Sequence, residues 1–357
     1  MQALVTGITG QDGGYLVLHL LQTLGYDRII SLVRRTSEDN PISRLRLPEL
    51  ITHLGSGRLK LEYGDVTDLH SIVRILRDYP GISEVYNLAG QTHVGISFDM
   101  PLATFEINGI GPVNVLEAIR VINPEIRLYQ ASTSEMFGDA AEMFCPQDEQ
   151  TPFWPNSPYG CAKAYAHRML VNARQYRNKP VRTVCGIPFN HESEVRGENF
   201  VTRKITLAAA RIRLGQQEVL ELGNLDSERD WGYAPDYVVA MHTMLQQQSE
   251  PAEWQDYVIA TGERRSVREF VSIAFEIAFS DTPNDLEWRG SGIDSVLLVN
   301  GVERVRVNPK FYRAKDINSL CGNPAKAIKE LGWNPRRTSF TTMVKRMVAH
   351  DLAEEKS

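Results

Sequence analysis

The 357-residue chain has no apolar run near the roughly 18 residues that a membrane span requires. We expect no signal peptide either, because the first apolar stretch, Ala3 to Thr6, leads straight into glycines. The 26 glycines and 18 prolines are too few for a collagen-like or wholly disordered chain. A net charge of −5 gives no general attraction to nucleic acid. We therefore expect a cytoplasmic globular protein that binds neither membranes nor nucleic acids.

Cysteine is scarce, and its placement excludes a cluster of thiolate ligands. The four cysteines are Cys145, Cys161, Cys185 and Cys321. They are widely separated and form no CxxC or zinc-like grouping. We expect reduced thiols, as is usual in the cytoplasm, and no bound metal.

Short apolar runs alternate with stretches of helical periodicity in the first half of the chain. The expected strands are Ala3–Thr6, Arg28–Val33, Leu59–Tyr63, Val85–Ala89, Arg127–Ala131 and Arg182–Ile187. This alternation predicts an α/β fold with a doubly wound parallel sheet of the Rossmann type.

The regularity fades after Phe189, although helices are still expected at Val267–Ala278 and Pro324–Leu331. Glycines, prolines and charged residues cluster between these shorter helices. We expect a dinucleotide-binding domain over residues 1–189, to which some later segments return. A smaller C-terminal lobe over residues 190–350, interleaved with that domain, is expected to bind mainly the substrate.

A glycine cluster follows the first expected strand, where residues 4–14 read LVTGITGQDGG. Gly7, Gly10 and Gly13 recur every three residues, and a helix is expected from about Gly14. Glycines allow a tight turn and close approach of a pyrophosphate, which the helix N-terminus stabilises. An ordinary strand-to-helix turn is the alternative, but the position after the first strand of an alternating chain favours a dinucleotide.

The second expected strand ends in Val33, Arg34 and Arg35, where an NAD-preferring site would carry an acidic residue. An arginine there suits the 2′-phosphate of NADP through charge-assisted hydrogen bonds. The alternative is a pair of solvated arginines. We predict NADP as the cofactor.

A YxxxK motif, Tyr159 and Lys163, lies in the segment SPYGCAKAYAH. Four residues apart on a helix, both side chains project from one face. The lysine ammonium favours the phenolate, so Tyr159 is predicted to act as an acid/base on a sugar hydroxyl. YxxxK alone is weak, and its value lies in its position after the fifth strand of a dinucleotide fold.

The fifth expected strand leads into the segment QASTSEMFG, which supplies Thr133 and Glu135. On its position alone, Glu135 is equally well a plain surface carboxylate. Beside a tyrosine/lysine pair, however, a carboxylate permits a second proton abstraction at a neighbouring carbon. Simple alcohol oxidation or 4-epimerisation does not need that step.

These motifs stand in a larger ordered set. The set comprises TGITGQDG, YGDVTD, NLAGQTHV, ASTSEMFG, TPFWPNSPYGCAKAYAH, FNHES, RGENFVTRKI, LGNLDSERDWGYAPDYV, YVIATGE, SVREFV and LGWNPR. On these segments the chain resembles the GDP-mannose 4,6-dehydratase family, a branch of the extended short-chain dehydrogenases/reductases, over nearly its whole length.

The resemblance implies an NADP-dependent lyase in which Tyr159 takes the 4-hydroxyl proton of the hexose and Lys163 lowers the pKa of that tyrosine. Thr133 would hydrogen-bond the 4-oxygen. Glu135 would remove the C5 proton, and because Ser134 is not acidic, Glu135 would also protonate the departing 6-hydroxyl. The product would be a 4-keto-6-deoxy sugar.

The resemblance also implies binding residues and a homo-oligomer, either a dimer or a tetramer. The cofactor residues would be Gly7, Ile8, Thr9, Gly10, Gln11, Asp12, Arg34, Asp65, Val66, Leu88, Ala89, Gly90, Gln91, Thr92, Tyr159, Lys163, His191 and Arg196. The residues for a GDP-sugar would be Thr133, Glu135, Tyr159, Asn190, Val201, Lys204, Gly223, Arg229, Arg313 and Asp316.

The chain departs from the family pattern in several places. The segment TSEDNPISRLRLPELI replaces a serine-rich loop that contributes to the tetramer interface and to a neighbouring chain's cofactor. SEVRG at Ser193–Gly197 lacks one arginine of the family pattern, Ala103 replaces a cofactor-lining tyrosine, and Pro188 replaces a leucine. Asp316 shortens a carboxylate expected to hold the guanosine ribose.

The departures leave one alternative substrate open, and two other functions compete with the dehydratase. Another GDP-sugar, such as a GDP-heptose, is one possible substrate. A GDP-4-keto-6-deoxy-sugar reductase or epimerase is another reading of the same fold, although such relatives generally lack the carboxylate at Glu135. A catalytically silent NADP-binding protein is disfavoured by the intact Thr133, Glu135, Tyr159 and Lys163.

Overall fold

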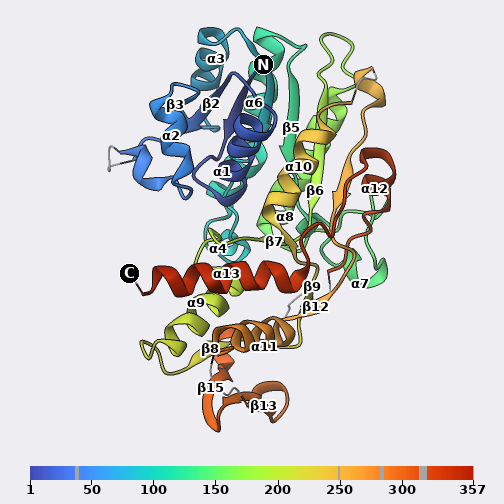
Figure 1. The fold of residues 1–357 in the computed structure, drawn as a ribbon. Helices are drawn as coiled ribbons and strands as arrows, with labels where there is room; N and C mark the ends of the chain where they lie inside the picture. Colours follow the sequence, from blue (N-terminus) through green and yellow to red (C-terminus); the bar gives the residue numbers. More distant parts are fainter. Residues whose placement is uncertain (37–39, 248–249, 282–284, 313–319, 357) are drawn as a thin grey trace.

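A seven-stranded parallel sheet forms the centre of the computed structural model, which describes residues 1–36, 40–247, 250–281, 285–312 and 320–356 (Figure 1). The strand order is β11-β6-β5-β4-β1-β2-β3. The bounds are β1 Gln2–Thr6, β2 Arg28–Val33, β3 Leu59–Tyr63, β4 Ile82–Asn87, β5 Arg127–Ala131, β6 Thr183–Pro188 and β11 Tyr257–Ile259. The predicted α/β class is confirmed, and the seventh strand comes from far along the chain.

Helices cover both faces of this sheet because neighbouring strand residues point to opposite sides. In β1, Ala3 and Val5 pack on one face and Leu4 on the other. The first face is covered by α1 (Gln11–Leu18) and α10 (Ala234–Met244). The second face is covered by α3 (Leu69–Asp78), α6 (Gly111–Ile122) and α8 (Pro158–Ala173).

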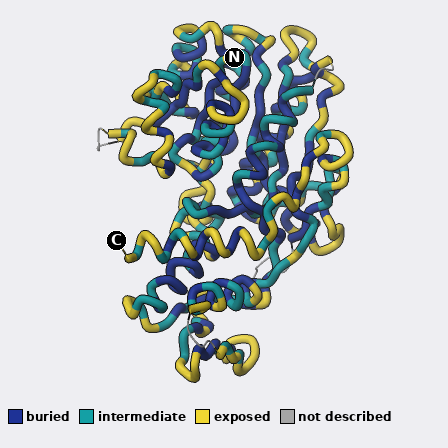
Figure 2. The backbone as a smooth tube through the Cα atoms, in the orientation of Figure 1, coloured by how far each residue is buried: buried dark blue, intermediate teal, exposed yellow. Residues whose placement is uncertain are grey.

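A second lobe has a separate apolar core at the carboxyl ends of the central strands. Its helices are α9 (Val201–Arg213), α11 (Val267–Ala278) and α13 (Phe340–Glu354). Its sheet has the order β13-β14-β15-β8, with bounds Leu286–Arg289, Val296–Val299, Val302–Val307 and Leu220–Leu222. In Figure 2 the central strands are buried along most of their length, whereas α13 alternates between buried and exposed turns.

Shorter elements complete the connections. They are α2 (Glu49–Gly55), α4 (Val94–Asp99), α5 (Pro101–Phe105), α7 (Ala140–Met143), α12 (Ala325–Leu331), β7 (His191–Glu192), β9 (Glu228–Arg229), β10 (Gly232–Tyr233) and β12 (Arg265–Ser266). No helix within the described ranges combines the length and apolar character needed to cross a membrane.

Local sequence explains where the key helices begin. Pro158 occupies the first turn of α8, and the Ser157 hydroxyl accepts a hydrogen bond from the Gly160 amide at 3.1 Å. Ser266 and Glu269 form a capping box, so α11 has the predicted bounds. The first helix, in contrast, begins at Gln11 and not near Gly14, because the glycines at 13 and 14 already lie inside it.

Candidate active site

The glycine turn between β1 and α1 is packed so tightly that side chains are excluded from it. Gly7 has φ +80°, and a Cβ there would lie 2.9 Å from the Ala89 nitrogen. A Cβ on Gly13 would lie 2.3 Å from the Gly7 carbonyl oxygen. The turn therefore folds back on itself and against the end of β4, as a backbone cradle for an anion requires.

Thr6 fixes this turn to the end of β4. Its hydroxyl donates to the Asn87 side-chain carbonyl at 2.7 Å. The same oxygen accepts from the amides of Leu88 at 3.1 Å and Ala89 at 3.0 Å. The backbones of the first and fourth strand ends are thereby held as one surface.

This surface borders a cavity of about 460 Å³, here called the glycine-turn cleft. The predicted cofactor residues that line it are Gly7, Thr9, Gly10, Gln11, Asp12, Arg34, Asp65, Val66, Leu88, Ala89, Gly90, Gln91, Thr92 and Arg196. Ile8 instead packs into the apolar core beneath the turn. Tyr159, Lys163 and His191 line a neighbouring cavity.

That neighbouring cavity, here called the Tyr159 cavity, also measures about 460 Å³. It shares Asp12, Leu88, Thr92 and Arg196 with the glycine-turn cleft. The predicted substrate residues that line it are Thr133, Glu135, Tyr159, Asn190, Val201, Lys204, Gly223 and Arg229. The other two predicted residues, Arg313 and Asp316, lie outside the described residues.

An ion pair between Asp12 and His191 joins the two cavities. The His191 Nε2 atom lies 2.9 Å from the Asp12 carboxylate. Burial would raise the pKa of Asp12, but the charge and hydrogen bond of His191 outweigh it and lower the pKa to about 2. Burial would likewise lower the pKa of His191, and Asp12 raises it instead. The His191 ring also stacks on Tyr237, with centroids 4.6 Å apart.

Tyr159, Lys163, Thr133 and Glu135 meet where α8 faces the end of β5. The pKa of Tyr159 is raised to about 12, because burial and the charge of Glu135 raise it by more than the hydrogen bond with Thr133 lowers it. Thr133 precedes a short 3-10 turn, Ser134–Met136, and its hydroxyl accepts from the Glu135 amide at 3.2 Å. The turn thereby carries Glu135 into the cavity.

Lys163 lies close to Tyr159 and is anchored to the end of β5. Its Nζ atom donates to the Ala131 carbonyl at 3.0 Å and lies 5.9 Å from the Tyr159 ring centroid. Burial lowers the pKa of Lys163 to about 8. Burial is the largest effect on the pKa of Tyr159 and raises it, so the lowering of that pKa by Lys163 stays a prediction.

The far end of the Tyr159 cavity carries positive charge and a half-buried amide. The Lys204 ammonium donates to the Glu221 carbonyl at 2.7 Å and lies 4.4 Å from the Phe311 ring centroid. Asn190 is half-buried, and among the described residues its enclosed side-chain oxygen has no hydrogen-bond partner. A Cβ on Gly223 would lie 2.4 Å from the Phe311 carbonyl oxygen, so this wall is made of backbone.

Two lining residues of the glycine-turn cleft, Arg44 and Arg46, are not predicted from the sequence. Arg46 donates to the carbonyls of Thr9 at 3.1 Å and Val195 at 2.8 Å, so it connects the glycine turn to the loop after β7. Arg44 donates to the Arg34 carbonyl at 2.7 Å. The sequence feature that could have indicated them is the pair of arginines in RLR, within a segment that departs from the family pattern.

The cysteines stay outside both cavities. All four are free; Cys145 and Cys161 are exposed, whereas Cys185 and Cys321 are buried. Burial raises the pKa of the Cys321 thiol to about 12. Across the described ranges, no group of three or more His, Cys, Asp or Glu side chains is arranged to hold a metal ion.

Comparison with known proteins gives one consistent family. Residues 4–347 match the family described as GDP-mannose 4,6 dehydratase. The chain is 47% identical to the GDP-mannose 4,6 dehydratase of Drosophila melanogaster, across 98% of this chain and 86% of that protein. It is 45% identical to the human GDP-mannose 4,6 dehydratase, across 98% and 91%.

Solved structures agree at the level of the fold. The dTDP-glucose 4,6-dehydratase DesIV of Streptomyces venezuelae, solved with NAD and TYD bound, has a TM-score of 0.78 at 21% identity, across 100% of this chain and 98% of that one. RMD from Pseudomonas aeruginosa, complexed with NADPH, has a TM-score of 0.75 at 19% identity, across 99% of each chain.

Proposed function

Because the chain belongs to the GDP-mannose 4,6-dehydratase family, we propose that it removes water from GDP-mannose to give GDP-4-keto-6-deoxymannose, with NADP as a tightly held cofactor. The observation that carries this proposal is the presence of Glu135 with Thr133, Tyr159 and Lys163 in one cavity beside the glycine turn. Oxidation or epimerisation at C4 needs the tyrosine and lysine. Elimination across C5 and C6 also needs a base at C5.

The glycine-turn cleft suits a dinucleotide. Gly7 and Gly13 leave no room for a Cβ, so backbone amides can approach a pyrophosphate. Arg34 and Arg196 supply charge for the phosphates, and Asp65 and Val66 form the side that would receive the adenosine. When bound, NADP supplies the acceptor and later the donor of the hydride that moves from C4 to C6.

Tyr159 and Thr133 would act together on the 4-oxygen of the sugar. Tyr159 takes the hydroxyl proton, and the hydrogen bond with Thr133 favours the phenolate against the effect of burial. Lys163, held by the Ala131 carbonyl, places its ammonium on the same face of α8 as the tyrosine. Burial of these groups excludes water from the proton transfer.

Glu135 would then carry out the elimination. A ketone at C4 acidifies the C5 hydrogen, and the Glu135 carboxylate removes it as a proton. The same carboxyl group gives the proton to the 6-hydroxyl, which leaves as water and creates a C5–C6 double bond. Reduction at C6 and protonation at C5, for which the proton taken up by Tyr159 is available, would complete the 4-keto-6-deoxy sugar.

The far end of the Tyr159 cavity suits the nucleotide diphosphate. Lys204 and Arg229 supply local positive charge in a protein whose net charge is −5. The enclosed side-chain oxygen of Asn190 offers an acceptor. The backbone wall at Gly223 permits close approach of a ligand, and Val201 at the start of α9 also lines the cavity.

We also propose that the enzyme is a homo-oligomer whose interface includes α4 and α5. The exposed apolar side chains of this segment are Ile96, Phe98, Met100, Leu102 and Phe105. Leu102 is 80% exposed, and such clusters commonly mark protein interfaces. Sedimentation velocity should give at least a dimer for the wild type and a monomer for Leu102→Lys; a wild-type monomer would contradict the proposal.

A cytoplasmic location is proposed as well, and the four free cysteines support it. Fractionation of cells that produce the protein would test this location. Recovery in a compartment that oxidises thiols would argue against it.

The function is tested by incubating the enzyme with GDP-mannose and measuring the product by mass spectrometry. We expect a product lighter by one water, and deuterium placed at C4 should appear at C6. Glu135→Gln should slow product formation about a thousandfold, because general acid/base catalysis is lost. Cofactor binding should persist in that variant, and the absorbance of reduced cofactor should still rise after substrate is added.

Glu142→Gln is the matched control, because it neutralises an exposed carboxylate on α7. It should leave turnover unchanged. Retention of GDP-mannose mass by the wild type would reject the dehydratase function. Full turnover by Glu135→Gln would reject the role of Glu135 alone.

A further inference from the structure

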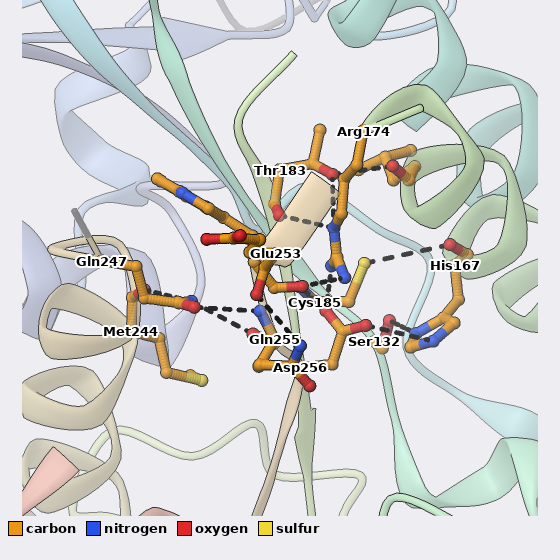
Figure 3. Close-up of polar contacts among 12 residues, drawn as sticks. Ser132, His167, Arg174, Thr183, Cys185, Met244, Gln247, Glu253, Gln255 and Asp256 are labelled. Atoms are coloured by element: carbon orange, nitrogen blue, oxygen red, sulfur yellow. Dashed lines mark hydrogen bonds and ion pairs between the residues drawn. The ribbon is translucent and has the colours of Figure 1, made fainter. Parts of the chain in front are cut away.

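A buried polar cluster lies between the end of β5, α8 and β6, and it takes no part in the mechanism proposed above (Figure 3). The cluster contains Ser132, His167, Arg174, Cys185 and Asp256. The Ser132 hydroxyl lies 2.9 Å from the His167 Nδ1 atom. Ser132 immediately precedes Thr133, so this contact fixes the backbone that carries a proposed catalytic residue.

His167 continues the row formed by Tyr159 and Lys163 on α8. The three residues are spaced by four, so they share one face of the helix. Lys163 bonds the Ala131 carbonyl, His167 meets the Ser132 hydroxyl, and Tyr159 bonds Thr133. Three successive helix turns thus contact three successive residues at the end of β5.

The opposite edge of the His167 ring faces the Asp256 carboxylate, which other residues hold in place. The His167 Nε2 atom lies 3.9 Å from Asp256, which precedes β11. Asp256 accepts from the Cys185 amide at 2.6 Å and pairs with Arg174. Arg174 in turn donates to the Trp254 carbonyl at 2.8 Å. The cluster therefore connects α8 to β5, β6 and the seventh strand.

The surroundings of His167 select one protonation state. Burial lowers the pKa of His167 to about 4, Asp256 opposes that effect, and Arg174 and Arg168 add to it, so the ring is neutral near pH 7. The nearby carboxylate favours the proton on Nε2. Nδ1 is then the acceptor for the Ser132 hydroxyl proton. The Phe153 ring packs against His167, with centroids 5.0 Å apart.

We propose that His167 is a positioning residue for the dehydratase. Its Nδ1 atom holds Ser132 and thereby sets the register of α8 on the end of β5, so that Tyr159 meets Thr133 at the 4-oxygen of the sugar. This inference rests on the proposed function. In this proposal Asp256, His167 and Ser132 together position the proton-transfer groups and do not contact the substrate.

Two substitutions of His167 separate hydrogen bonding from packing. His167→Asn keeps an acceptor near the Nδ1 position but loses the ring. His167→Phe keeps a ring against Phe153 but loses the acceptor. We expect His167→Phe to lower kcat for GDP-mannose about tenfold with KM unchanged, because misplacement of reacting groups acts on the chemical step. His167→Asn should recover most of that loss.

Ser132→Ala removes the same hydrogen bond from the other side, and the double variant with His167→Phe should be no slower than the slower single variant. Deuterium at C4 of the substrate should slow these variants more than the wild type, because the first proton and hydride transfers become limiting. Arg177→Gln, an exposed change beyond the end of α8, is the control. Rates are expressed per folded, cofactor-bound enzyme, which corrects for loss of stability.

The outcomes distinguish the two proposals. A wild type that dehydrates no GDP-mannose rejects the proposed function, and the positioning role with it. An active wild type with an active His167→Phe and an impaired His167→Asn shows a packing role and overturns the positioning role alone. An unchanged isotope effect in Ser132→Ala and His167→Phe overturns it as well.

Discussion

The glycine-turn cleft and the Tyr159 cavity have nearly equal volumes, yet they are built from different parts of the chain. The cleft contains the closely packed backbone at the ends of β1 and β4, which are neighbours in the sheet, with charged side chains around it. The Tyr159 cavity is lined largely by side chains, among them residues of α8, of α9 and of the segments that follow β5 and β6, with backbone forming its wall at Gly223. Closely packed backbone cannot accommodate an added atom, whereas a surface of side chains changes its binding gradually when one side chain is replaced. The two should therefore respond differently to substitution.

Electrostatics sharpen this difference. In the Tyr159 cavity, burial raises the pKa of Tyr159 to about 12 and lowers that of Lys163 to about 8. In the cleft, Arg34, Arg44 and Arg46 lie beside the glycine turn, and their charge suits phosphates. The cavity therefore adjusts protonation, while the cleft supplies fixed shape and fixed charge.

The largest effect is expected from adding one methyl group to the cleft. Gly13→Ala would place a Cβ 2.3 Å from the Gly7 carbonyl oxygen, so the turn must open. We expect NADPH affinity, measured by fluorescence titration, to fall about a hundredfold, in line with the cost of overpacking. Gly55→Ala is the matched control, because its Cβ would meet no atom within 4 Å.

Equal NADPH affinity in Gly13→Ala and Gly55→Ala would break the comparison. It would mean that cofactor binding in the cleft depends on side chains and not on the close packing of the glycine turn. The arginines on its rim would then carry the binding.

A smaller, graded effect is expected in the Tyr159 cavity. Lys204→Gln removes one charge near the proposed diphosphate position and keeps a polar side chain. We expect KM for GDP-mannose to rise about tenfold with kcat little changed, because the lost charge stabilises the substrate and the transition state alike. Lys345→Gln, an exposed change on α13, should alter neither constant. A kcat loss as large as the KM rise would instead place Lys204 in the chemical step.

Much of the central sheet is predictable from the sequence, because its strands are buried on both faces. The predicted strands lie within three residues of β1 to β6. β11 escapes prediction, since Tyr257–Ile259 is too short to show a period. The start of α1 is misplaced because glycines favour a turn locally, and only packing against Gly7 shows that Gly13 belongs to the helix.

The identities of the site residues are also readable from motifs, but their electrostatic state is not. YxxxK places Tyr159 and Lys163 on one face of α8, yet their pKa values depend on burial by β5 and the second lobe. Arg46 escapes prediction because its partners, Thr9 and Val195, lie far away in the sequence. Such long-range contacts require the folded chain.

The smallest effect is expected at the Asp12–His191 pair, which belongs to both the cleft and the cavity. In Asp12→Asn, burial should dominate and bring the pKa of His191 below its ordinary value of 6.5, as NMR titration of the ring would measure. Asp99→Asn, an exposed change at the end of α4, should leave that titration unchanged. An unchanged pKa in Asp12→Asn would mean that the two cavities are electrostatically independent.

The sign of the accompanying stability change follows from linkage. The pKa of His191 is raised in the folded state, so its contribution is complete below 6.5 and is lost as pH rises through the folded value. The pKa of Asp12 is lowered to about 2, so its contribution is complete above 3.8 and is lost as pH falls towards 2. The thermal stability of the wild type relative to Asp12→Asn should therefore be greatest between pH 3.8 and pH 6.5 and should fall below and above that range. Equal pH profiles for the two proteins would show that the Asp12–His191 pair adds no stability.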